Sequence, residues 1–200
     1  GFSWIAAANW IGMAGFAAVW ATVGVSLVVL TGWGGQISLG QFGFAGVAGM
    51  GAGNLVARWN ADFFLAILAS AAAGAVAALL IGLPALRIKG LFLAATTLAM
   101  GVALDQYFLN TDTFPQFIPT SGVPRPLLLQ RFDLNNYYEL YVVCLLFLVL
   151  AIVATVGLRK SRAGRVLIAT NDNERAAAST SVGTTGVKLA GFVTAGVIAG

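Results

Sequence analysis

The chain contains no histidine, a single cysteine and few charged residues. Without histidine it cannot form a histidine proton relay, a His–Cys zinc site or a Ser–His–Asp hydrolase triad of its own. Cys144 lies within an apolar run, forms no intrachain disulfide and gives no information on the redox compartment. The phosphate-binding motif Gly-x-x-x-x-Gly-Lys-Ser/Thr is also missing, so the chain cannot bind ATP through it. These absences argue against an enzyme.

The composition is that of a membrane protein. Of its 200 residues, 59% are hydrophobic and 9% are charged, with a mean hydropathy of +0.89. Soluble domains typically carry about 25% charged residues. The 25 glycines favour helices that approach each other closely in lipid, and the alternating strands that a membrane barrel needs are absent. We therefore expect an all-α integral membrane protein, a polytopic bundle of transmembrane helices.

The apolar runs predict a single transmembrane domain over residues 1–200. A span needs roughly 20 mostly apolar residues, and the expected spans are 10–31, 40–57, 63–83, 90–109, 138–158 and a truncated 189–200. Because the chain begins without methionine and ends inside an apolar run, we expect it to be a fragment.

The basic residues predict the orientation. Arg159, Lys160, Arg162 and Arg165 directly follow the fifth span, and basic clusters beside spans stay on the cytoplasmic side. We therefore expect 159–188 to be a cytoplasmic loop and the proline-rich segment 110–137 to be periplasmic. Since the basic residues at span ends explain most of the net charge of +4, we expect no nucleic-acid partner.

A glycine-rich segment, Gly32–Gln41, lies between two apolar runs. Its glycines predict a break in the helix, and irregular backbone at membrane depth is tolerated only where it is buried in protein or lines water. Its uncharged polar residues Gln36, Ser38 and Gln41, with Thr97 from the fourth span, are candidates for lining a translocation path. The segment could be broken or re-entrant, and a tight glycine turn with solvated amides remains an equal alternative.

The loop 159–188 contains a short predicted helix. Asn or Asp residues from Asn171 onward can cap its start, Glu174 can lie in its first turn, and alanines follow. Such a helix suits docking of a soluble partner, and an ordinary solvated loop is the alternative.

Three segments together resemble a known family. Leu30–Phe44 has the sequence LTGWGGQISLGQFGF, Leu86–Ala99 has LRIKGLFLAATTLA, and Gly164–Ala177 has GRVLIATNDNERAA, followed by Lys188–Phe192. Their order and spacing are similar to those of the permease subunit of bacterial ABC importers for branched-chain amino acids, the LivM-like branch that also includes urea and amide permeases. Gln41 stands where that family usually has histidine.

The resemblance implies a permease of the bacterial inner membrane that is not an enzyme and binds no cofactor, with ATP and Mg²⁺ on a partner chain. The implied partners are ABC ATPase subunits, a second permease subunit, a periplasmic substrate-binding protein and membrane lipid. The residues expected in the ATPase-coupling loop are Arg165, Asp172, Glu174, Ala177, Ala178 and Lys188.

The expected function is ATP-driven import of branched-chain amino acids by alternating access. A urea or amide permease is one alternative, and an ATP-independent channel for small solutes is another. Transport that needs neither ATP nor partner chains would identify the channel.

Overall fold

The computed structural model describes residues 2–36, 38–59, 61–86, 91–108, 137–173, 177 and 183–200. Within these ranges all regular secondary structure is helical, as expected. The α-helices and the two π-helical segments, η1 and η2, are α1 (Phe2–Leu27), η1 (Val28–Trp33), α2 (Gln41–Trp59), α3 (Phe63–Ala85), α4 (Leu91–Ala103), η2 (Leu104–Phe108), α5 (Tyr137–Lys160), α6 (Arg162–Asp172) and α8 (Thr184–Ala199).

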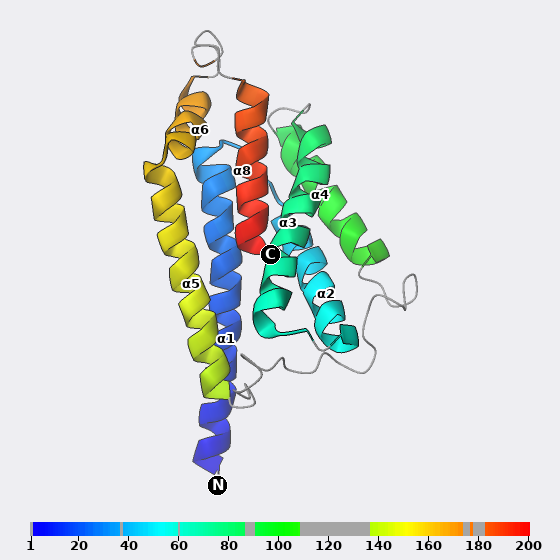
Figure 1. Ribbon diagram of the computed structural model, residues 1–200, viewed down its shortest axis with the longest axis vertical. Coiled ribbons are helices and arrows are strands. Elements are labelled where there is room, and N and C mark those ends of the chain that lie inside the picture. The colour runs from blue at the N-terminus through cyan, green and yellow to red at the C-terminus, as the bar shows by residue number, and fades with distance from the viewer. Residues whose placement is uncertain are drawn as a thin grey trace.

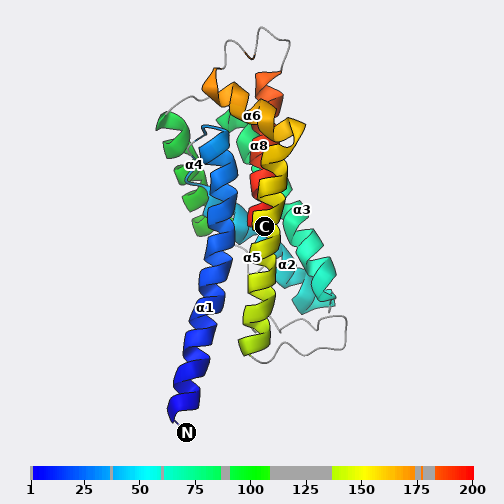
Figure 2. The same ribbon diagram turned by 90° about the vertical axis from the view of Figure 1, so that its left-hand side faces the viewer.

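The helices form two groups that α8 connects (Figure 1). In one group α1 and α5 lie side by side, and in the other α3 packs against α2. Helix α8 packs against α3 and also contacts α1. Figures 1 and 2 both place α6 at the end of the bundle where α1 finishes and α8 begins. The turn of π-helix η1 that precedes the glycine-rich segment is therefore at the same end as α6, and the two are in contact.

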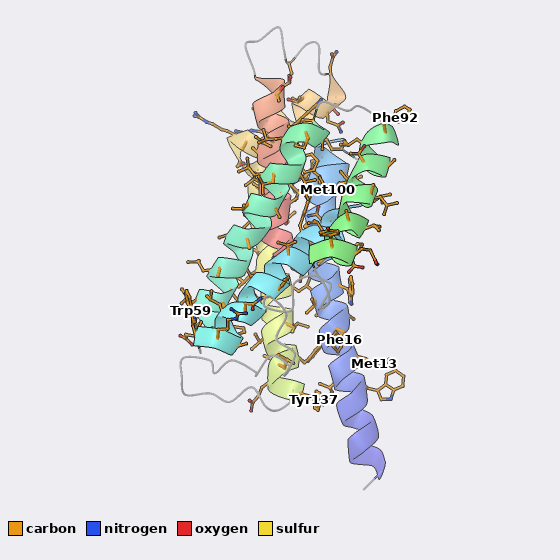
Figure 3. The ribbon with its side chains drawn as sticks, turned by 90° about the vertical axis from the view of Figure 1, so that its right-hand side faces the viewer. Met13, Phe16, Trp59, Phe92, Met100 and Tyr137 are labelled. Atoms are coloured by element: carbon orange, nitrogen blue, oxygen red, sulfur yellow. The ribbon has the colours of Figure 1, made fainter. Side chains whose placement is uncertain are left out.

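Large apolar side chains cover the outside of the bundle. Figure 3 shows Met13, Phe16 and Phe92 pointing away from the helices, and they are 65%, 71% and 77% exposed. Helix α5 buries Thr155 alone. Apolar exposure on this scale is unfavourable in water and is what a lipid-facing surface requires.

Three helical segments of the described chain are long and apolar enough to cross a membrane: Trp10–Trp33, Phe63–Ala85 and Tyr137–Lys160. The structure thus agrees with a polytopic membrane protein. The boundaries of the other expected spans stay predictions, as do the sides of the membrane assigned to 110–137 and 159–188. Residues 109–136 lie outside the described chain.

Small residues bring α3 and α8 into backbone contact. A Cβ atom added at Gly74 would overlap the carbonyl oxygen of Gly196, and one added at Gly196 would meet the Cβ of Ala78 at 2.5 Å. Phe192 is fully buried on Gly82, where an added Cβ would lie 3.1 Å from its ring. Because lipid gives helices little hydrophobic reason to associate, such close packing is a main source of their attraction.

The helix α6 was not expected to begin as early as Arg162. Its start is set by Ser161, whose Oγ accepts the N–H of Gly164 at 3.1 Å. Asn171 and Asp172 belong to its last turn and cap no helix start. Asn173 is extended and its carbonyl accepts the N–H of Ala177, as an N-cap residue does. The expected helix beyond it lies largely outside the described residues and stays a prediction.

The contact between α3 and α8 can be tested with two glycines. We expect Gly74→Ala to lower the free energy of unfolding by about 1–3 kcal/mol, the usual cost of overpacking. Gly49→Ala is the matched control, because a Cβ there meets no atom within 4 Å; it should be neutral or stabilising by up to about 1 kcal/mol. Unfolding in detergent followed by circular dichroism measures both. Equal stability of the two variants would contradict the close packing.

Candidate functional site

The glycine-rich segment leaves the helix inside the protein. After η1, the N–H of Gly34 bonds to the carbonyl of Val29 and the N–H of Gln36 to that of Leu30, at 3.1 and 3.2 Å. These bonds span five and six residues, wider than the four of an α-helix, so the chain unwinds gradually. Gly35 has a φ of +62°, a conformation that glycine adopts without steric cost. Residues 34–36 and 38–40 are not helical, and α2 begins at Gln41.

All four residues predicted to line a path are buried. Gln36, Ser38, Gln41 and Thr97 are between 0% and 4% exposed. The polar side chains of the segment are therefore not exposed, whereas Gly35 and Leu39 are. The structure places three of these residues in or directly after the break and the fourth on the helix that holds it.

Thr97 anchors the break to α4. Its Oγ1 accepts the backbone N–H of Leu39 and donates to the carbonyl of Ala94, both at 3.1 Å. The two chains come this close because Gly40 faces α4: a Cβ at Gly40 would lie 2.5 Å from the carbonyl oxygen of Thr97. Gly43 on α2 likewise faces Gly101 on α4, where an added Cβ would lie 3.1 Å from Cα. Thr97 thus gives one N–H of the break an acceptor that regular structure does not supply.

Gln41 connects three helices. Its Nε2 donates to the Oγ of Ser26 on α1 at 2.8 Å and to the carbonyl of Ala195 on α8 at 3.0 Å. Ser26 in turn donates to the carbonyl of Val23 at 2.6 Å. Hydrogen bonds between helices in a membrane contribute about 0.6 kcal/mol on average and up to about 1.7. Gln41 therefore fixes α8 against α1 at the start of α2.

Four buried polar atoms of this site have no hydrogen-bond partner: Nε2 and Oε1 of Gln36, Oγ of Ser38 and Oε1 of Gln41. Leaving a buried donor or acceptor unpaired costs about 1–3 kcal/mol. Such groups in a native protein need an explanation, and an unseen ligand or water is one of the usual ones. The unpaired atoms include both donors and acceptors and carry no charge. They can hold a neutral or zwitterionic molecule by hydrogen bonds, and they offer no acid–base chemistry.

Two members of the site were not predicted. Ser26 was missed because Thr22 and Thr31 carry hydroxyls in the same apolar span, and nothing in the sequence distinguishes Ser26 from them. The carbonyl of Ala195 could not have been found, since any helical residue has one and only the packing selects it.

The described residues expected in the coupling loop lie at the end of the bundle where α6 and η1 are found. Arg165 and Asp172 are exposed on α6, while Lys188 on α8 and Ala177 are partly buried. Of the described ones, Arg165 and Asp172 share α6, and the other two come from other segments. Glu174 and Ala178 lie outside the described residues.

Helix α6 is amphipathic and packs through one face. Leu167 and Thr170 are 4% and 2% exposed, and an added Cβ at Gly191 on α8 would lie 3.3 Å from Leu167. A groove of about 480 Å³ runs beside this contact between α6 and α8. The buried face holds α6 on the bundle, and its charged residues face outward.

Comparison with known proteins agrees with the membrane architecture. A family model described as "Branched-chain amino acid transport system / permease component" matches residues 9–200. The chain is 26% identical over 207 residues to the "High-affinity branched-chain amino acid transport system permease protein LivM" of Salmonella typhimurium (strain LT2), an alignment covering 91% of this chain and 48% of that protein. The chain thus spans about half the length of this curated relative. No solved structure matches it.

The anchor at Thr97 is testable by removing its hydroxyl. Thr97→Val leaves the N–H of Leu39 without an acceptor, and we expect it to cost about 1–3 kcal/mol of unfolding free energy. Thr97→Ser keeps the oxygen and should stay near the wild type. The matched control is Thr96→Val, because Thr96 is exposed and donates only within its own helix, to the carbonyl of Phe92. A Thr97→Val protein as stable as Thr96→Val would contradict the anchoring role.

Proposed function

The chain belongs to the permease-component family of branched-chain amino acid transport systems, and from this premise we propose that its buried break is part of the path of an ATP-driven amino-acid importer. The chain is a membrane component of such a system and not an enzyme. The observation that carries the proposal is the set of four buried, unpaired and uncharged polar atoms on Gln36, Ser38 and Gln41.

The chemistry of these atoms suits an amino acid. A zwitterion carries an ammonium group that needs acceptors and a carboxylate that needs donors, and the unpaired atoms supply both without a net charge. On the helical segments that flank the break, the fully buried side chains of Val29, Leu30 and Phe44 are apolar, which is the kind of surroundings an aliphatic side chain requires. The family description and the name of the relative from Salmonella support branched-chain amino acids as the substrate.

ATP hydrolysis is assigned to separate ATPase subunits on the cytoplasmic side. We propose that the loop 159–188 faces that side and that Arg165, Asp172, Glu174, Ala177, Ala178 and Lys188 contact the ATPase. The outward-facing charges of α6 and its location at the end of the bundle support this assignment. A second permease subunit and a periplasmic binding protein complete the proposed importer in the inner membrane.

Transport then follows from two arrangements of one bundle. ATP binding closes the ATPase dimer and displaces the docked loop, and this shifts the helices between an outward-open and an inward-open state. Such a shift requires contacts that differ between the two states. The backbone of the break can adopt a different conformation in each state, since few regular hydrogen bonds hold it.

Replacing Gln36 separates folding from transport. Gln36→Met removes two unpaired buried atoms, so we expect stability that is unchanged or higher by up to about 3 kcal/mol. Uptake of leucine by the assembled transporter should fall roughly 2- to 10-fold, corresponding to one lost hydrogen bond to the substrate. Thr22→Val is the control, because Thr22 donates only to the carbonyl of Ala18 in its own helix. Unchanged uptake and substrate preference would make the break structural only.

Charge reversal tests the docking of the ATPase. We expect the double variant Asp172→Lys and Glu174→Lys to lose the ATPase subunit on co-purification in detergent, because the new charges repel a surface that binds acidic residues. Glu139→Lys is the control, since Glu139 is exposed at the start of α5, far from α6 (Figure 1). An ATPase absent from every preparation, including the wild type, would contradict the importer and favour the ATP-independent channel.

A further inference from the structure

One contact joins α6 directly to the glycine-rich segment. A Cβ atom at Gly35 would overlap the side-chain amide oxygen of Asn171, so that amide lies on the Cα of Gly35. Asn171 is in the last turn of α6, and most of its side chain is exposed. Gly35 also has the left-handed backbone that favours glycine. The left-handed backbone therefore favours glycine at position 35, and the end of the Asn171 side chain lies where a Cβ atom would be.

Helix α6 can pass movement to this contact. Its buried side chains Leu167 and Thr170 hold it against the bundle, and a Cβ at Gly164 would overlap the carbonyl oxygen of Leu158, so its first turn is packed tightly on the end of α5. Asn171 is one turn beyond Leu167, within the loop 159–188 that is proposed to dock on the ATPase. A displacement of α6 in that loop therefore moves Asn171 with it.

Beyond the contact lies the unpaired side chain of Gln36. It follows Gly35 directly in the chain, and its backbone is held by Leu30, which accepts its N–H, and by Thr31, whose Oγ1 donates to its carbonyl at 3.3 Å. Because Gln36 is bonded directly to Gly35, a shift at Gly35 that changes the backbone torsions between them would re-aim the Gln36 side chain, and the two hydrogen bonds to η1 oppose that change. Close packing makes such shifts discrete changes between arrangements.

We propose that Asn171 is a positioning residue that transmits movement of α6 to the break through its contact with Gly35. This inference rests on the proposed function and adds to it the pair of residues that links the docking loop to the path. In one state of the transporter the Asn171 amide lies on Gly35 and holds Gln36 in its buried position. In the other the end of α6 withdraws and releases it.

The test uses the complete transporter in liposomes, with its ATPase subunits and binding protein, and radiolabelled leucine as the transported probe. Leucine uptake and ATP hydrolysis are measured in the same sample. We expect Asn171→Ala to assemble normally and to lower the leucine transported per ATP hydrolysed by about 2- to 25-fold, the range for residues along a coupled network. The matched control is Thr96→Ala, an exposed residue of α4 outside the proposed docking loop that donates to the carbonyl of Phe92 in its own helix, and it should keep the wild-type ratio.

A second pair of variants tests the contact itself. Gly35→Ala should impair coupling more strongly, because its methyl group overlaps Asn171, and Gly35→Ala with Asn171→Gly should recover part of the loss. Should Gly35→Ala fail to assemble, Asn171→Ala alone decides. A wild type that couples uptake to hydrolysis, together with an Asn171→Ala variant of the same ratio, would overturn this inference and leave the proposed function intact. A wild type whose uptake is independent of ATP would overturn the proposed function.

Discussion

Every peptide group that leaves a helix inside a membrane protein must find another partner. In the described chain this constraint is concentrated at residues 34–36 and 38–40, where a helix ends next to the buried side chains of Gln36 and Ser38. The solutions are local: wide turns return two N–H groups to η1, and the hydroxyl of Thr97 accepts a third. Around this segment the bundle is built so that α4 approaches it through glycines and α1 and α8 are tied together by Gln41. The cost of unpaired peptide groups in lipid makes each of these contacts necessary.

The polar side chains of the break differ in what they do. The amide nitrogen of Gln41 and the hydroxyl of Thr97 are used within the protein and keep the break in place. Both polar atoms of the Gln36 side chain and the hydroxyl of Ser38 are buried without use. Gln41 and Thr97 therefore stabilise the fold through these atoms. The side chains of Gln36 and Ser38 are available for a substrate or for water. The paired groups hold the backbone in place, and the unpaired groups gain hydrogen bonds when a polar molecule binds.

The helical architecture could be predicted from the sequence because apolar runs and glycine-rich breaks are local signals. The glycines indicated the break, and polar residues within apolar sequence indicated the three polar residues at the break and Thr97 on α4. The start of α6 was missed because its cap at Ser161 directly follows the basic cluster, where no apolar run marks a helix. The contact of Asn171 with Gly35 and the bond from Gln41 to Ala195 could not have been predicted, since both join segments whose distance in space depends on packing. Sequence patterns name the polar residues, and only the packing decides which of them are paired.

The contact between α4 and the chain around the start of α2 is formed mainly through small residues, as is that between α3 and α8. At Gly40, Gly43 and Gly101 the two backbones come close together, and the side chains of Thr97 and Leu104 lie beside them. The hydrogen bond from the N–H of Leu39 to Thr97 crosses the same contact. Sliding of α4 along this contact would therefore have to break that hydrogen bond, whereas the glycines themselves present no side chain to obstruct the movement.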